Sequence, residues 1–65
     1  MNKKLTPREK QVCELLILGT ANIDIAIALS MSKDAVKKHL KNLFRKFNAK
    51  NRTHLAYILG KDAIL

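Results

Sequence analysis

The stretch AVKKHLKNLFRKF, residues 35–47, carries five Lys and Arg residues and no Asp or Glu. On a helix with about 100° per residue, its apolar side chains form a stripe roughly 100° wide, the width of a core-facing side. This stripe consists of Val36, Leu40, Leu43, Phe44 and Phe47. Lys38, Lys41 and Arg45 fall on the opposite side, with Lys37 at its edge. The pattern predicts a helix that is anchored by one face and presents positive charge on the other.

The positive charge of the chain is concentrated in one segment. The net charge is +8 at pH 7, and eight of the thirteen Lys and Arg residues lie within residues 33–52, where Asp34 is the only acid. Such clustering indicates a polyanionic partner, either nucleic acid or an acidic membrane surface. A membrane-surface or partner-binding module is the alternative, because basic amphipathic helices also bind lipid. Lipid-binding helices usually present Trp or Phe on a free face, however, whereas Phe44 and Phe47 belong to the core-facing stripe.

Composition excludes several other classes of protein. With 65 residues, 48% of them hydrophobic, the chain is one folded domain near the lower size limit rather than a disordered tail. Cys13 is the single cysteine and lies in an apolar run, so a packed thiol is expected; His39 and His54 have no thiolate partners, so no metal or cofactor is expected. No phosphate-binding loop or nucleophile–base arrangement predicts an enzyme. Without a signal peptide or a long apolar span, the sequence predicts a cytoplasmic protein that does not enter the membrane.

Local signals in the first half of the chain predict two helices. Thr6, Pro7 and Glu9 form the pattern of a capping box with proline at the first helical position, and Gly19 is the expected stop of that helix. A second helix is expected from near Asn22 to about residue 29.

Two more helices are expected in the second half. Ser32 is the predicted cap of a helix over about residues 33–47, Asn48 its left-handed stop, and Asn51 the cap of an apolar helix over about residues 52–61. No stretch alternates like a strand, so the predicted fold is an all-α four-helix bundle. Two helices joined by a short turn, the second basic outside and apolar inside, indicate a helix-turn-helix over about residues 22–41. A helix about 10–12 Å across fits the DNA major groove of about 12 Å, where its outer cations would lie between phosphates.

Several motifs together resemble those of the LuxR/GerE-type helix-turn-helix of bacterial transcription regulators. These are LTPREKQV at 5–12, Gly19 followed by NIDIA at 22–26, VKKHL at 36–40 with FRKF at 44–47, and NRT at 51–53. The resemblance runs without gaps from residue 5 to about residue 59. It implies a DNA-binding domain of a transcription regulator, LuxR family, that binds double-stranded DNA as a homodimer on inverted half-sites. It also implies a response regulator output domain, with an upstream sensory or receiver domain or RNA polymerase as possible partners.

The resemblance also implies roles for particular residues. Contacts to bases or the groove are expected from Lys37, Lys38 and Lys41. Contacts to DNA phosphates are expected from Ser32, Lys33, His39, Arg45, Lys46 and Arg52. For four of these six a structural role stays open: His39 could pack in the core, Arg45 or Lys46 could bond a helix end, and Arg52 could pair with Glu9.

The chain departs from the family pattern at four positions. Ala21 replaces the usual small polar cap, Ser30 the usual turn glycine, Ala35 a hydroxyl residue and Ile23 a common lysine. The last two changes remove one phosphate hydrogen bond and one phosphate charge.

Some apolar residues are left over after the core stripes are assigned. Leu18, Ile23 and Ile27 fall beside or away from the stripes of the first two helices, so a docking surface there is a hypothesis. Tyr57 and Leu65 are surplus to the core in the last helix and beyond it, and we expect them in a dimer interface.

Overall fold

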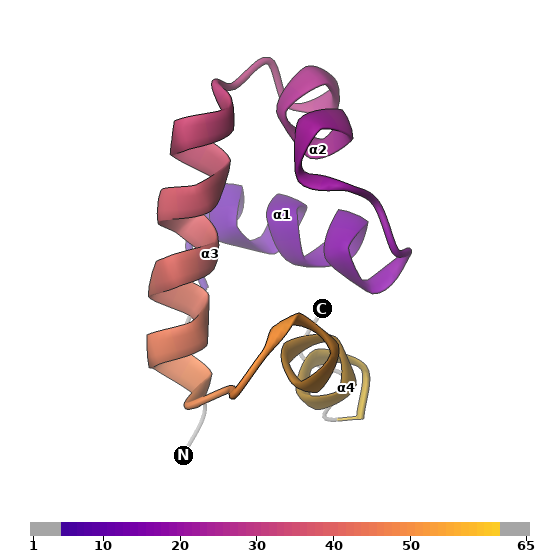
Figure 1. Cartoon of the computed structure of the whole chain (residues 1–65), viewed down its shortest axis with the longest axis vertical. Coiled ribbons are helices and arrows are strands. Elements are labelled where there is room, and N and C mark those ends of the chain that lie inside the picture. The colour runs from indigo at the N-terminus through magenta and orange to yellow at the C-terminus, as the bar shows by residue number, and fades with distance from the viewer. Residues whose placement is uncertain (1–4, 62–65) are drawn as a thin grey trace.

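The computed structural model describes residues 5–61, and this part of the chain forms four α-helices. They are α1 (Pro7–Ile17), α2 (Asn22–Ala28), α3 (Lys33–Phe47) and α4 (Arg52–Lys61). No strand occurs between residues 5 and 61, so the all-α, four-helix prediction is confirmed. The longest helix, α3, runs along one edge of the molecule, and the other three pack on one side of it (Figure 1).

Side chains cap three of the four helices at their first turn. The Thr6 hydroxyl oxygen accepts from the Glu9 amide at 3.1 Å, and the Glu9 carboxylate accepts from the Thr6 amide at 3.0 Å. Ser32 and Asn51 each accept from the amide three residues later, at 3.0 and 2.8 Å. These three predicted caps are confirmed. Ala21, at the cap position of α2, makes no such bond, so the start of α2 needs support from elsewhere.

Three helices end in the same way. The residues that end them have positive φ: 83° at Gly19, 54° at Ser30 and 53° at Asn48. In each case the amide of the following residue donates to the carbonyl five positions earlier, at 2.8–3.1 Å, which satisfies an otherwise unpaired carbonyl of the last turn. The stops predicted at Gly19 and Asn48 are confirmed. Ser30 adopts the left-handed conformation that glycine usually supplies, and α2 ends at Ala28, one residue earlier than expected.

The core lies between all four helices. Val36, Leu40 and Leu43 of α3 are buried, and Phe44 and Phe47 are half-buried against the same cluster, so the predicted apolar stripe is confirmed. The other helices contribute the remaining buried residues, which are Val12, Cys13, Leu16, Ile25, Ala26, Leu55 and Leu59. The burial of this stripe fixes which side of α3 faces outward.

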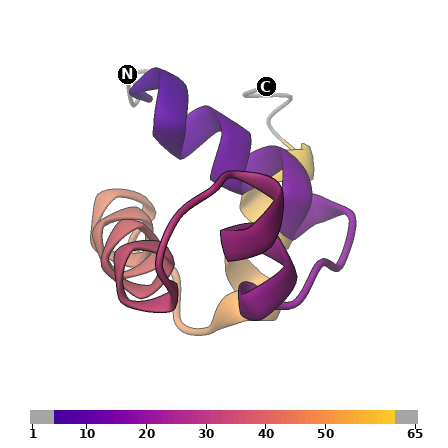
Figure 2. The same cartoon turned by 90° about the horizontal axis from the view of Figure 1, so that it is seen from above.

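A short connection over residues 29–32 joins α2 to α3, and the two helices pack against each other. Seen from above, α2 lies beside α3 at the same end of the molecule (Figure 2). This arrangement of two helices and a short turn is a helix-turn-helix, with α3 as its second helix. Within residues 5–61, no helix has the length and apolar character needed to cross a membrane.

Candidate nucleic-acid interface

The outward side of α3 is a row of cations. Lys37, Lys38, Lys41 and Arg45 are all exposed, whereas the opposite side of the helix is held in the core. The helix is also oriented favourably for its charges, because Asp34 lies in its first turn and the basic residues of its last turn lie at the negative end of the helix dipole. The structure therefore presents positive charge on a rigid element, at a spacing fixed by core packing.

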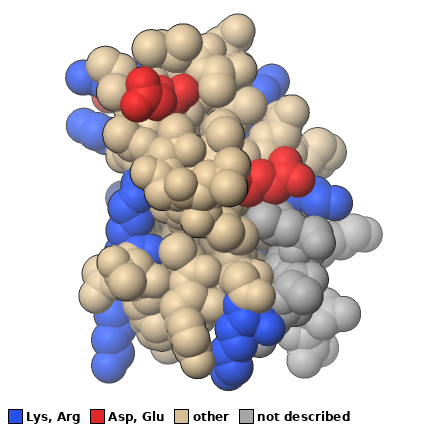
Figure 3. Space-filling model, turned by 90° about the vertical axis from the view of Figure 1, so that its right-hand side faces the viewer, with Lys and Arg blue, Asp and Glu red and all other residues tan. Residues whose placement is uncertain are grey.

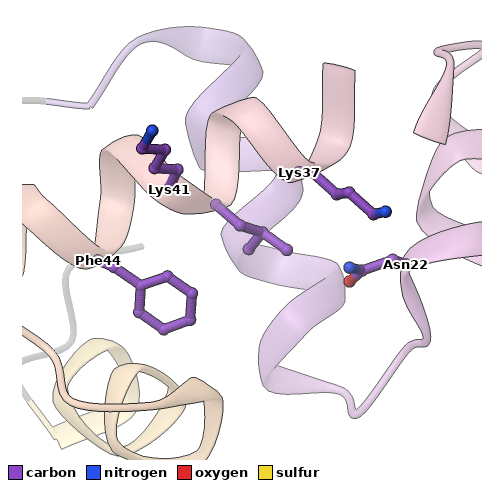
Figure 4. A pocket seen from close by; sticks show the side chains of 5 residues that line it. Asn22, Lys37, Lys41 and Phe44 are labelled. Atoms are coloured by element: carbon purple, nitrogen blue, oxygen red, sulfur yellow. The ribbon is translucent and has the colours of Figure 1, made fainter. Parts of the chain in front are cut away.

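A shallow open pocket of about 240 Å³ lies where this row meets the start of α2. Leu40 and Phe44 provide apolar lining, while Lys37, Lys41 and Asn22 contribute polar groups (Figure 4). The side chains of Lys37 and Asn22 come from different helices and point toward each other across it. Among the polar residues that line the pocket, Asn22 was not predicted as a site residue, because its position opposite Lys37 depends on how α2 packs against α3.

The remaining predicted phosphate contacts on the first half of α3 differ in their exposure. Ser32 and Lys33 are exposed at the start of the helix, and the Ser32 oxygen also serves as the cap. His39 is half-buried and close enough to Glu9 to lower the pKa of that carboxyl by its charge. Ser32 and Lys33 thus lie at the surface of the helix-turn-helix, whereas His39 lies at the boundary between core and surface.

Lys46 is held against α1. Its ammonium lies 2.7 Å from the carboxylate of Glu9, which is buried. Burial raises the pKa of Glu9, but the hydrogen bond from Lys46, the bond from the Thr6 amide and the nearby charges of Lys46 and His39 outweigh it, and the pKa of Glu9 is lowered. This ion pair favours the structural alternative for Lys46, namely that it fixes the end of α3 on α1.

Arg52 also has partners inside the protein. Its guanidinium donates to the side-chain oxygen of Asn22 and to the carbonyl of Thr20. These bonds tie the first residue of α4 to the start of α2, the helix that lacks a side-chain cap. The suggested pairing of Arg52 with Glu9 is wrong, because Glu9 pairs with Lys46 and Arg52 bonds to Asn22 and Thr20 instead. Arg52 thus helps to hold α2 in place within the helix-turn-helix.

The residues expected in a dimer interface are described only in part. Tyr57 is 62% exposed on α4, and the Lys61 ammonium lies 5.9 Å from the centre of its ring. Leu65, the other residue expected there, lies outside the described residues. Near the start of the same helix, His54 accepts from the Lys50 amide at 3.0 Å, which orders the connection between α3 and α4.

Cys13 is packed in the core, as its apolar neighbours predicted. Burial, with a smaller contribution from the charges of Glu9 and Glu14, raises the pKa of its thiol to about 11. The thiolate, which is the reactive form, is therefore scarce at neutral pH. Among residues 5–61, no group of three or more His, Cys, Asp or Glu side chains is placed to hold a metal ion.

A helix-turn-helix whose second helix is apolar inside and cationic outside defines the class of this protein as a DNA-binding domain. Comparison with known families agrees: residues 3–59 match the GerE family, described as bacterial regulatory proteins, luxR family, and the chain belongs to it. The resemblance noted in the sequence is thereby confirmed. This family consists of DNA-binding domains of transcription regulators, which is not a class of enzyme.

Curated relatives are transcription regulators. The CsgBAC operon transcriptional regulatory protein of Escherichia coli (strain K12) is 49% identical over 49 residues, which cover 75% of this chain and 23% of that protein. The putative HTH-type transcriptional regulator YhjB of the same strain is 39% identical over 58 residues, covering 89% of this chain and 29% of that protein. The nitrate/nitrite response regulator protein NarL, also from that strain, is 33% identical over 61 residues, covering 94% and 28%. The chain thus spans less than a third of the length of each of these relatives.

Proposed function

We propose that this chain reads specific double-stranded DNA sequences with α3 in the major groove, as a homodimer on inverted half-sites. One observation carries the proposal: core packing of Val36, Leu40 and Leu43 turns a row of exposed cations outward from a helix that fits the groove. In this arrangement the whole chain is the DNA-binding unit, with the helix-turn-helix over about residues 22–41 and α4 available for dimer contacts.

The predicted DNA-contact residues divide into three groups in this proposal: base contacts, phosphate contacts and residues that hold the helices in position. Lys37, Lys38 and Lys41, on the second and third turns of α3, are the proposed base contacts, because the N-terminal part of a recognition helix contacts base edges. The phosphate contacts of the proposal come from Ser32, Lys33 and Arg45, which are exposed. His39, Lys46 and Arg52 support these contacts by holding the helices in position, as their half-buried places and the internal bonds of the last two suggest.

The membrane alternative receives less support from the packing. Phe44 and Phe47 are half-buried against the core cluster, so they do not form a free aromatic face on α3. Because one relative is a response regulator, we also propose that this domain works with a sensory or receiver domain, or with RNA polymerase, in transcription control. These partners are part of the proposal.

Selection of bound sequences from a pool of random duplex DNA tests the proposal. We expect enrichment of a short motif repeated in inverted orientation. Binding should also weaken steeply with salt, with log K falling by about 0.9 per decade of salt for each of roughly four to six phosphates contacted per subunit. A selection that enriches no motif, or an affinity that does not change with salt, contradicts the proposal. So does competition by anionic lipid vesicles that matches competition by DNA.

A further inference from the structure

One acidic residue stands within the row of cations on α3. Asp34 is the only acid in residues 33–52, which also carry eight Lys and Arg residues. At about 100° per residue, Asp34 lies within roughly 40° of Lys38 and Lys41 around the helix axis, so these three side chains leave α3 on the same side. All three are exposed, and the buried stripe that contains Val36 lies on the opposite side. Asp34 therefore faces the same partner that the cations face.

This location of a carboxylate opposes the binding of a polyanion. The side of the molecule opposite α3 is largely uncharged, with Lys and Arg mainly at its margins, so it offers a duplex little positive surface (Figure 3). On α3, by contrast, a negative charge repels the phosphates and weakens binding to every DNA sequence. Only a hydrogen-bond donor on the DNA, placed to meet the carboxylate, would offset this repulsion.

The structural role of Asp34 within α3 is limited. Ser32 already caps the helix, because its hydroxyl oxygen accepts from the Ala35 amide at 3.0 Å. The position of Asp34 in the first turn is favourable toward the helix dipole, an effect that is small for an exposed side chain. Within residues 5–61, no ion pair or side-chain hydrogen bond involves its carboxylate. Its oxygens are therefore accessible to a donor from outside the protein.

The major groove presents few groups that a carboxylate can bind. An ionised carboxylate only accepts hydrogen bonds, whereas guanine presents the acceptors N7 and O6, and thymine presents the acceptor O4. Adenine presents its N6 donor beside the N7 acceptor, and cytosine presents its N4 amino donor alone. Cytosine is thus the best match. The position agrees, because Asp34 is the second residue of α3 and the N-terminal part of a recognition helix contacts base edges.

We propose that Asp34 is a specificity-determining residue, which accepts a hydrogen bond from the N4 amino group of a cytosine in each half-site. This inference rests on the proposed function, since it requires α3 to lie in the major groove. Where another base replaces the cytosine, the carboxylate loses this bond while its repulsion from the phosphates remains. Asp34 thus weakens binding to non-matching DNA more than binding to the matching site, and the cations Lys38 and Lys41 attract both.

Selection from random duplex DNA, run in parallel for the parent and two variants, tests this inference. For the parent we expect a preference for cytosine at one position of each half-site, by roughly fivefold or more. Asp34→Asn keeps the shape of the side chain and adds an amide donor, which matches N7 and N6 of adenine, so the preference there should change to adenine. Asp34→Ala should lose the preference at that position only. It should also bind scrambled duplexes severalfold more tightly, because a charge that repels phosphates is removed.

Glu14→Ala removes the same charge from an exposed position on α1 and is the matched control, which should enrich the parent's motif. Circular dichroism checks that each variant is folded. If the parent enriches a motif that both Asp34 variants reproduce at every position, the inference is overturned and the proposed function stands. A parent preference for a base other than cytosine at the changed position also overturns it. So does a loss of affinity that is equal on all duplexes, which is the result expected if Asp34 only stabilises the start of α3. If the parent enriches no motif, the proposed function itself fails and this inference fails with it.

Discussion

The side chain of Glu9 caps a helix, forms an ion pair and is buried. Its carboxylate accepts from the Thr6 amide and from the Lys46 ammonium, so it closes the first turn of α1 and attaches α3 to it. The ion pair requires the ionised form, and ionisation also strengthens the bond from the Thr6 amide. Burial raises the pKa of the carboxyl, yet the positive partners lower it below its ordinary value of 4.5, which shows that the charged form is stabilised in the folded protein.

This lowered pKa predicts a pH dependence of stability. The contribution of Glu9 is fully present above the unfolded value near 4.5 and is lost as the pH falls through the lower, folded-state value. The difference in unfolding free energy between the parent and Glu9→Gln should be constant near neutral pH and shrink below about pH 4.5. Urea denaturation at a series of pH values measures it. Glu14→Gln, at an exposed position on the same helix, is the control and should show a smaller change. A difference that stays constant down to the acid transition would contradict this role.

Ser30 carries a second residue-level prediction. Its φ of 54° is a left-handed conformation in which a Cβ atom is unfavourable, and glycine adopts it freely. Ser30→Gly should therefore raise the free energy of unfolding by about 0.5–1 kcal/mol. Ser32→Gly is the matched control, because Ser32 has a φ of −76° and caps α3, so the same change there should lower stability by a few tenths of a kcal/mol. Equal effects at the two sites would show that the backbone conformation is not the cause.

At the scale of the helix, caps and apolar stripes could be predicted from the sequence, whereas contacts between residues far apart in the chain could not. Caps and apolar stripes are local, and those at Thr6, Ser32 and Asn51 could be predicted because a side chain three residues away satisfies the amide. The bond of Lys46 to Glu9 spans 37 residues, and that of Arg52 to Thr20 spans 32. Such pairs depend on how helices cross, so the pattern could offer only several candidate roles for those two cations.

The proposal gives different roles to two lysines of α3: Lys41 contacts bases, whereas Lys46 holds the helix against α1. Lys41→Ala should lose roughly 1–3 kcal/mol of affinity for the selected site and flatten the base preference there, if Lys41 reaches a base edge. Lys46→Ala should instead lower the stability of the fold, because Glu9 would stay buried without its partner. Binding assays on the selected and on scrambled duplexes, with thermal denaturation of each variant, separate the two effects.

Lys10→Ala, an exposed lysine on α1, controls for the loss of one positive charge. If Lys41→Ala loses the same affinity on every DNA sequence, and no more than the control loses, Lys41 does not contact bases. If Lys46→Ala leaves the stability of the fold unchanged, the ion pair does not hold α3 against α1.

At the scale of the whole molecule, the cationic surface and the surface proposed for dimer contacts belong to different helices. The cations of α3 lie along one edge of the molecule, and α4 with its exposed Tyr57 lies at the end away from α2 (Figure 1). α4 has enough inward-facing residues for the core, since Leu55 and Leu59 are buried and Ile58 is half-buried. Tyr57 is therefore available for contact with a second copy, and the strongly cationic α3 is unsuited to such a contact.

An isologous contact through α4 would place two recognition helices about 34 Å apart, one turn of DNA, which is the spacing that inverted half-sites require. Because such an interface is small, the free domain should be mostly monomeric and pair only on DNA, where binding of one subunit raises the local concentration of the next. Tyr57→Glu places a charge in that contact without disturbing the core, since Tyr57 is largely exposed.

We expect Tyr57→Glu to keep its helical circular dichroism and its affinity for a single half-site, while cooperative filling of paired half-sites is lost. Gel-shift titrations on duplexes with one and with two half-sites measure this. Gln11→Glu adds the same charge to an exposed position on α1 and should leave cooperativity intact. If the folded Tyr57→Glu variant fills paired half-sites as cooperatively as the parent, α4 does not form the dimer contact and the two subunits must meet through another surface.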